Sequence, residues 1–319
     1  MKAALLMKLL SSVLVCLSLS GAALGDEPPR FEVPATAPGA PFTFIVYGDT
    51  RFTEREGVAN AQARRALVER IAQEAPAAVL IGGDLVYQGS DPADYATFQR
   101  ETAAWSQRKI AVFPALGNHE FQGCLRGGNG CLENWWQAFA PLALKPHRWY
   151  SVTLASSILA LVLDSAAPLK PGSEQRVWFE RQIEGAGSGV RFILVVMHYP
   201  PVRDPIFPRG YQENEIARYF SRNAGQLHAR VIVVGSHVHN YERYSRDGVM
   251  YLVSGGGGAK PVPAPRMFGE LSHLRTGVNF HYLRFVLANG ALTATMVRYD
   301  ARDPAAWTEP DRFEVKARD

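Results

Sequence analysis

Several apolar runs of the sequence end in side chains that bind metal ions in proteins. These side chains are Asp49, Asp84, Asn118, His198, His237 and His239. In open α/β sheets, ligands bind at the carboxyl ends of the strands, so we expect these residues to converge on one edge of a sheet. A lone Gly-Asp or Gly-Asn-His is common, whereas the ordered set on successive strands is specific. The sequence therefore predicts a metal centre assembled from residues that lie far apart in the chain.

The runs themselves have the pattern of strands that are buried on both faces. Each holds a continuous apolar block instead of an alternating one, which is typical of strands in a parallel sheet. They cover residues 42–49, 77–84, 109–120, 157–165, 190–198 and 229–239. Amphipathic stretches follow the runs, and strands that alternate with helices predict an α/β fold with mostly parallel pairing.

A helix is predicted between the first two runs. Its apolar residues recur at helical spacing, and its charged residues are expected to face away from them. The apolar residues are Ala63, Leu67, Ile71 and Ala75, and the charged ones are Arg64, Arg65, Glu69 and Arg70.

Past residue 245 the pattern changes to short strands joined by tight turns, within residues 248–258, 280–300 and 311–317. Ala288-Asn289-Gly290 is a hairpin signal, so we expect the chain to end in an antiparallel sheet. We expect a single domain over residues 42–319, after an extended Pro-rich lead-in at residues 26–41.

Residues 1–25 have the features of a signal peptide. Lys2 and Lys8 precede an apolar stretch, and Ala23-Leu24-Gly25 fits a cleavage site before Asp26. The apolar stretch breaks into Ser and Gly before it reaches the roughly 20 residues that span a bilayer, so we expect no stable membrane anchor. The mature protein is expected to be exported, either periplasmic or secreted.

The composition predicts a globular protein, because 47% of the residues are hydrophobic and 20% are charged. The mature chain carries 32 basic groups, which is 34 less the two lysines of the leader, against 30 acidic groups. Such a balance is unlike the basic patches that bind nucleic acid, so no nucleic-acid partner is expected.

Two cysteines are left in the mature chain, Cys124 and Cys131, in a Gly-rich stretch. Export to an oxidising compartment predicts a disulfide between them, which would close a loop at the rim of the site. Two thiolates without further soft ligands nearby make a poor metal site.

The ligand residues lie in blocks that resemble the calcineurin-like metallophosphoesterase superfamily, and in detail the purple acid phosphatases. The blocks are Gly48-Asp49, Gly83-Asp84-Leu85-Val86-Tyr87, Gly117-Asn118-His119-Glu120, the segment around His198, and Ser236-His237-Val238-His239-Asn240-Tyr241-Glu242-Arg243. The resemblance spans residues 42 to about 258. It implies an α/β fold with two central mixed β-sheets, packed as a sandwich and flanked by helices.

The resemblance also implies how the ligands divide between two metal ions. Asp49, Asp84, Tyr87 and His239 would hold a first ion, and Asp84, Asn118, His198 and His237 a second. Asp84 would bridge the two. Carboxylates and a phenolate suit Fe(III), whereas imidazoles, an amide oxygen and a shared carboxylate suit Fe(II), Zn(II) or Mn(II).

Three residues of these blocks need separate comment. Most of the superfamily has a histidine ligand where this chain has Arg51, while Tyr87 stands where purple acid phosphatases place a phenolate. Arg51 either binds a phosphate oxygen of the substrate or pairs with a carboxylate outside the pocket. His119 is either the general acid, which we favour, or a residue that orients Asn118.

Residues next to the blocks are expected to support the site. Asp164 is expected to cap a turn, and Gly255–Gly258 to let the backbone pass close beneath the metals. The residues expected to orient the imidazoles are Glu120, Tyr199, Glu242 and Arg243.

The resemblance thus implies an exported acid phosphatase, a hydrolase that acts on phosphomonoesters of small molecules or of phosphoproteins. A metal-bound hydroxide would attack phosphorus directly, with Arg51 and His119 contacting the substrate. The alternatives are a phosphodiesterase or nucleotidase on the same scaffold, with substrate choice in loops 121–135 and 200–213. A further alternative is a non-catalytic metal- or phosphate-binding protein.

Overall fold

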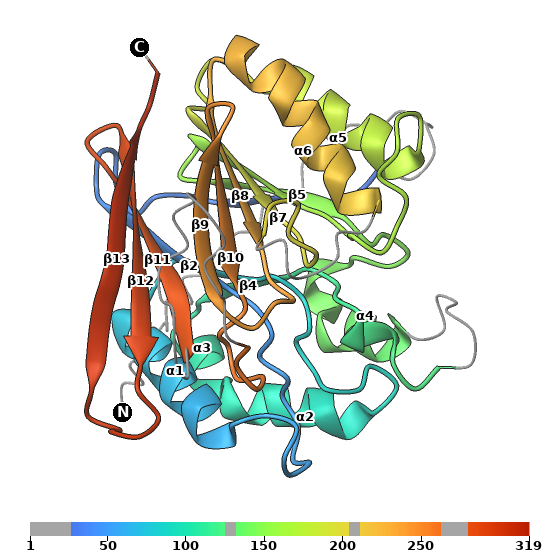
Figure 1. Ribbon diagram of the computed structural model, residues 1–319, viewed down its shortest axis with the longest axis vertical. Coiled ribbons are helices and arrows are strands. Elements are labelled where there is room, and N and C mark those ends of the chain that lie inside the picture. Colours follow the sequence, from blue (N-terminus) through green and yellow to red (C-terminus); the bar gives the residue numbers. More distant parts are fainter. Residues whose placement is uncertain (1–26, 125–131, 204–210, 263–279, 319) are drawn as a thin grey trace, which may run out of the picture.

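The computed structural model describes residues 27–124, 132–203, 211–262 and 280–318. Within these residues, the strands form two β-sheets that pack face to face over a shared apolar core, with helices outside them (Figure 1). The predicted sandwich of two mixed sheets flanked by helices is confirmed. The predicted signal peptide, residues 1–25, lies outside the described residues.

One sheet has seven strands and the other has six. The first sheet has the spatial order β1 (Arg30–Val33), β5 (Tyr150–Leu154), β6 (Ile158–Val162), β7 (Phe192–Val196), β8 (Arg230–Gly235), β10 (Val249–Ser254) and β9 (Tyr241–Arg246). The second has the order β13 (Trp307–Lys316), β12 (Ala291–Tyr299), β11 (Phe280–Ala288), β2 (Phe42–Tyr47), β3 (Ala78–Ile81) and β4 (Ala111–Pro114). All six runs predicted as strands therefore contain one.

The α-helices are α1 (Ala61–Glu74), α2 (Pro92–Glu101), α3 (Ala103–Gln107), α4 (Glu133–Ala138), α5 (Glu174–Glu184) and α6 (Tyr211–Asn223). Short 3-10 helices are η1 (His119–Phe121), η3 (Ala140–Leu142) and η4 (Ala224–Gln226). Among the described residues, no helix combines the length and the apolar character needed to cross a bilayer.

Alternation along the central strands explains the layers. Leu194 and Val196 of β7 face the core between the sheets, whereas Ile193 and Val195 face a second core under α5 and α6. Both faces of β7 are therefore apolar, which is why its sequence reads as one continuous block. Burying each such side chain contributes roughly 1.5–3 kcal/mol to folding.

The C-terminal strands form the predicted antiparallel hairpins. Asn289 (φ 50°) and Gly290 (φ 73°) make the two-residue connection between β11 and β12, and both adopt the left-handed conformation that such turns require. β11 also pairs antiparallel with β2, whose other neighbour, β3, is parallel to it. The expected antiparallel sheet is thus one half of a mixed sheet.

Three strands, β1, β5 and β9, were not predicted. β1 lies inside the stretch expected to be an extended lead-in, and it pairs in parallel with β5. β9 begins two residues after His239 and pairs antiparallel with β10. Nothing in the local pattern of these short segments distinguishes a strand from a loop, and it is pairing with a neighbour that fixes them.

The predicted helix is α1, but two of its residues were placed wrongly. Ala75 was expected on the apolar face, yet it follows the last residue of α1 and is exposed. Ala63, Leu67 and Ile71 are buried as expected, whereas Arg64 is buried too, with 1% of its surface exposed. Two of its nitrogens donate to the Glu101 carboxylate, at 2.8 and 2.7 Å. Its guanidinium also donates to the main-chain carbonyls of Arg51 and Thr53 (2.9 and 3.2 Å), which it holds in place beside the strand ends.

Replacing Glu101 by Gln should therefore destabilise the protein by about 3–5 kcal/mol, because it leaves a buried guanidinium without its counter-charge. Glu69→Gln, on the exposed face of α1, is the matched control and should change stability little. Urea unfolding of both variants measures the difference. Equal stability of the two would mean that Arg64 is not held by this pair.

Candidate metal centre

The residues predicted to bind metal follow the carboxyl ends of five parallel strands. Asp49, Asp84 and Asn118 follow β2, β3 and β4, and His198 follows β7. His237 and His239 follow β8, which pairs in parallel with β7. The expectation that these residues share one edge of a single sheet is wrong, because β2, β3 and β4 belong to one sheet and β7 and β8 to the other. The two sheets present these strand ends to one another, so ligands from both sheets meet.

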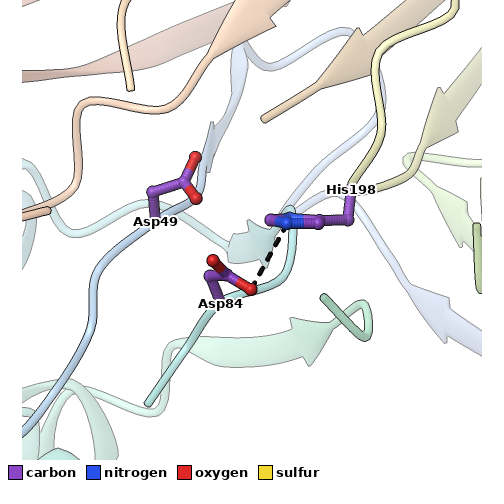
Figure 2. Close-up of side chains that lie close together, drawn as sticks. All are labelled: Asp49, Asp84 and His198. Carbon is purple, nitrogen blue, oxygen red and sulfur yellow. Dashed lines mark ion pairs between the residues drawn. The ribbon is translucent and has the colours of Figure 1, made fainter. Parts of the chain in front are cut away.

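Asp49, Asp84 and His198 each offer one ligand atom, and these atoms lie within 4.8 Å of one another (Figure 2). All three side chains are buried. In Figure 2 they come from separate loops, and a dashed line joins the Asp84 carboxylate to the His198 ring. A cluster of this kind, drawn from both sheets, is the core of the predicted centre.

Three donor atoms surround the ring nitrogen Nε2 of His198, itself a predicted ligand. It lies 3.0 Å from Asn118 Oδ1, 3.2 Å from His237 Nδ1 and 3.3 Å from Asp84 Oδ1. These are the four residues expected to hold the second ion. The structure brings the complete set together.

A second group lies on the other side of Asp84. His239 Nε2 is 3.5 Å from Asp49 Oδ1, and Arg51 Nη2 is 3.5 Å from Asp84 Oδ2. Asp49 also joins the two groups through the backbone, because its Oδ2 accepts a hydrogen bond from the His237 amide at 2.6 Å. Asp84 faces both groups with different oxygens, as a bridging ligand must.

Main-chain carbonyls fix the direction of two imidazoles. His198 Nδ1 donates to the carbonyl of Gly82 at 3.0 Å, and His239 Nδ1 donates to that of Lys260 at 2.9 Å. A carbonyl only accepts, so in each neutral ring Nδ1 carries the proton and Nε2 presents its lone pair to the site. Backbone acceptors leave no side-chain signal, and sequence reasoning did not find them.

Two carboxylate oxygens in the site are buried and accept no hydrogen bond within the described part of the chain. They are Asp49 Oδ1 and Asp84 Oδ2. Burying an unpaired charged oxygen is costly, and a bound cation relieves that cost. Together with the two imidazole lone pairs, these oxygens fit a metal centre.

The same buried groups have perturbed acidities. Burial would raise the pKa of Asp84, but the charges of His198 and His119 outweigh it and hold the pKa below its ordinary value. Burial, aided by His198, lowers the pKa of His237 to about 3. A deprotonated carboxylate and a neutral imidazole are the forms that bind metal.

Backbone strain is concentrated at the same positions. Asp49 (φ 57°), Asp84 (φ 51°), His237 (φ 69°) and His239 (φ 53°) are all left-handed, which residues other than glycine rarely adopt. Strain of this kind persists only where the surrounding structure enforces it.

Glu120 holds part of this strained backbone in place. Its Oε2 accepts hydrogen bonds from the backbone amides of Asp84 (3.0 Å) and Gly117 (2.6 Å), and its Oε1 accepts one from Val86 at 3.3 Å. Burial, together with the charge of Asp84, raises the pKa of Glu120 to about 7. Glu120 thus supports the site by joining the loops after β3 and β4, and none of these bonds goes to an imidazole.

Comparison with known proteins identifies the family of this chain. A family model described as calcineurin-like phosphoesterase matches residues 42–241. The chain belongs to this family. Comparison with curated proteins gave no match.

Solved structures show the same fold. Purple acid phosphatase PPD1 from seeds of yellow lupin (Lupinus luteus) is similar with a TM-score of 0.69 and 17% identity, over 91% of this chain and 56% of the lupin chain. GAP50, the anchor in the inner membrane complex of Plasmodium, gives a TM-score of 0.56 and 15% identity, over 88% of this chain and 91% of that one. A dimetal phosphatase from Danio rerio gives 0.56 and 13%, over 85% and 99%. This chain thus spans little more than half of the lupin enzyme's length.

His119 lies at the wall of the site. Its backbone amide donates to Asp84 Oδ1 at 2.9 Å, and its Nε2 lies 3.7 Å from Asp84 Oδ2. Nδ1 donates to the carbonyl of Tyr87 at 2.5 Å. Burial lowers the pKa of His119, although the charge of Asp84 opposes the shift.

Tyr87 stands beside His119, with 5.4 Å between the ring centres. The guanidinium of Arg55 lies 5.6 Å from the centre of the Tyr87 ring. The structure thus puts Tyr87 next to the site, and its role as a phenolate ligand stays a prediction.

Arg51 lies inside the site, not outside it. Its Nη2 is 3.2 Å from His239 Nε2 and 3.5 Å from Asp84 Oδ2. Two roles were considered for Arg51, binding a phosphate oxygen and pairing with a carboxylate. This one position is compatible with both, because the carboxylate with which Arg51 pairs is itself a predicted metal ligand.

The remaining supporting residues divide into two groups. Tyr199 packs its ring 4.6 Å from that of His237, as expected of a support. Arg243 instead pairs with Asp311 of β13 at 2.8 Å, and Glu242 accepts a hydrogen bond from Tyr244 at 2.6 Å. The first contact joins β9 to β13, the second lies within β9, and neither reaches an imidazole.

Two expectations outside the ligand set have different outcomes. Asp164 does cap a turn, since its Oδ1 accepts a hydrogen bond from the Ala166 amide at 2.8 Å. The disulfide between Cys124 and Cys131 stays a prediction, because Cys131 lies outside the described residues.

The glycine run after β10 passes directly under the ligands, as predicted. A Cβ atom on Gly255 would lie 2.4 Å from Asp49 Oδ2 and 2.7 Å from the backbone nitrogen of His239. Only a residue without a side chain fits at this position.

Gly255→Ala should therefore displace Asp49 and His239 and reduce the amount of metal that the protein retains. Elemental analysis of the purified variant, beside Gly187→Ala, measures this effect. Gly187 is a suitable control because a Cβ added there would meet nothing within 4 Å. A Gly255→Ala protein with undiminished metal would show that the close approach does not position the ligands.

Proposed function

We propose that this phosphoesterase is an exported acid phosphatase that hydrolyses phosphomonoesters at a centre of two metal ions. The observation that carries the proposal is the position of Asp84 between two groups of donors. Its Oδ1 lies 3.3 Å from His198 Nε2, which in turn contacts Asn118 and His237. Its Oδ2 lies 3.5 Å from Arg51 Nη2, which in turn contacts His239. A shared carboxylate flanked by two such groups suits two ions better than one.

The donor types suggest which ions bind. Asp49, Asp84 and Tyr87 offer hard anionic oxygens with the His239 imidazole, which suits Fe(III). The group around His198 has two imidazoles and an amide oxygen, which suits Fe(II), Zn(II) or Mn(II). When bound, such a pair of ions supplies an activated water and neutralises the oxygens of the phosphate group.

His119 is the residue that we assign to protonation of the leaving group. The Tyr87 carbonyl holds the proton of Nδ1, so Nε2 is the nitrogen that exchanges a proton with the site. The ring must carry a proton on both nitrogens to act as the acid, and because burial lowers its pKa this form is populated at acidic pH. When the bond between phosphorus and the ester oxygen breaks, the Nε2 proton passes to that oxygen, an alcohol leaves, and His119 becomes neutral. His119 Nε2 lies close to the bridging carboxylate, where the phosphate group would bind.

The fold by itself does not decide for catalysis, since GAP50 shares the fold and is described as an anchor. The complete donor set and the presence of His119 favour an enzyme over a non-catalytic binding protein. The likeness to the lupin purple acid phosphatase supports the choice of reaction. Phosphodiesterase or nucleotidase activity on the same scaffold remains the alternative, and the loops expected to select substrates lie partly outside the described residues.

Export is proposed from the leader at residues 1–25 alone. A periplasmic or secreted phosphatase would meet phosphorylated small molecules and phosphoproteins, which are the substrates that we propose.

His119→Ala should lose far more activity on an alkyl phosphate than on nitrophenyl phosphate. An alkoxide needs a proton to depart, whereas nitrophenolate leaves well without one, and general acid catalysis contributes about 10²–10⁴-fold. Steady-state kinetics on both substrates, with metal content determined on the same samples, tests the assignment. If both substrates lose activity equally and metal is lost too, His119 serves to orient Asn118 instead.

Iron-loaded protein should absorb visible light and appear purple or pink, because a phenolate bound to Fe(III) gives a charge-transfer band. Tyr87→Phe should remove the band while leaving the iron content unchanged. Visible spectra and iron analysis of the two proteins make the comparison. A colourless wild type with stoichiometric iron would rule out Tyr87 as a ligand.

A further inference from the structure

The guanidinium of Arg51 contacts two atoms that are predicted to bind the first ion. Its Nη2 lies 3.2 Å from His239 Nε2 and 3.5 Å from Asp84 Oδ2. A guanidinium has no acceptor, so the hydrogen bond to His239 must run from Arg51 to the ring nitrogen. The hydrogen bond from Arg51 therefore occupies the lone pair of His239 Nε2. That lone pair faces the site because His239 Nδ1 donates its proton to the Lys260 carbonyl.

A metal ion at the first site needs the same lone pair and the same carboxylate oxygen. Guanidinium and metal ion are both cations, and two cations cannot share a ligand atom at bonding distance. Binding of the ion therefore requires the guanidinium to leave His239 and Asp84.

The backbone of Arg51 cannot make this movement. Its amide donates to the Asp84 carbonyl at 3.0 Å, and its carbonyl accepts from Arg64 Nη1 at 2.9 Å. Arg64 is in turn fixed by the bidentate bond to Glu101. The side chain is held less firmly, because Arg51 Nε is buried and has no hydrogen-bond partner in the described structure.

We propose that Arg51 competes with the metal ion for the first site and makes that site the weaker of the two. The inference rests on the proposed two-metal centre. Around His198, by contrast, the three other donor atoms lie within 3.3 Å of its Nε2, so the second site should fill first. The displaced guanidinium stays beside the centre on a fixed backbone, where it can bind an oxygen of the phosphate substrate.

Calorimetric titration of chelator-treated protein with Zn(II) tests the competition directly. The wild type should show one tight and one weak binding step, and His239→Ala should lose the weak step. Arg51→Met removes the charge while keeping a long side chain. It should tighten the weak step by about tenfold or more, the size of effect that one neighbouring charge has on a pKa, and leave the tight step unchanged.

Arg100→Ala is the matched control, because it also removes one positive charge but pairs with Glu54 at the surface. It should leave both steps as in the wild type, and circular dichroism should show that all variants are folded. Two binding steps with the same affinities in wild type and Arg51→Met would contradict the proposal that Arg51 competes with the ion. The proposed two-metal centre would still stand. Uptake of a single ion, or none, by both proteins would overturn the two-metal centre and the competition with it.

Discussion

The buried carboxylate of Asp84 needs positive charge around it, and much of the site is arranged to supply that charge. Removing a lone carboxylate from water costs several kcal/mol, so a position with no exposed surface must provide compensating partners. The chain provides His198, the His119 amide and Arg51, and these lower the pKa of Asp84 despite its burial. Within the described residues, one of its oxygens accepts no hydrogen bond. A buried oxygen of this kind is suited to contact a cation.

Holding Asp84 in that position requires a backbone that the local sequence does not favour. The residue is left-handed, and so are Asp49, His237 and His239. Parallel strands bring two of these residues to the strand ends of each sheet, and Glu120 ties two of the loops together through three backbone amides. Glycines such as Gly255 and Gly117 pack against ligand atoms where a methyl group would collide. The stability of the two-sheet core therefore supports the strain at its edge.

Arg51 and Arg64 form a second level of organisation in the site. Arg64 and Glu101 are a buried pair within the helical layer, yet the hydrogen bonds of Arg64 end on the loop that carries Arg51. The Arg64–Glu101 ion pair, which contributes to folding, thus also sets the position of the Arg51 guanidinium inside the candidate metal centre. The arrangement differs from the pattern of most of the superfamily, in which a histidine ligand takes the place of Arg51. In place of that ligand, this chain has the positive charge of Arg51, whose position is fixed by the fold.

The sequence by itself determined the family and the two-sheet fold, and it identified the polar residues that follow the strand ends. Strands buried on both faces read as continuous apolar runs, and residues at the carboxyl ends of parallel strands in one sheet lie at the same edge. That the strand ends of the two sheets meet was decided by tertiary structure. Tertiary structure alone decided the burial of Arg64, the pairing of β1 and β9, and the place of Arg51. The helical spacing of α1 put Arg64 on the polar side, but Glu101, Arg51 and Thr53 supply partners from other segments. Arg51 lies in the site for the same reason: its contacts come from residues distant in sequence, His239 among them, and only the folded chain brings them together.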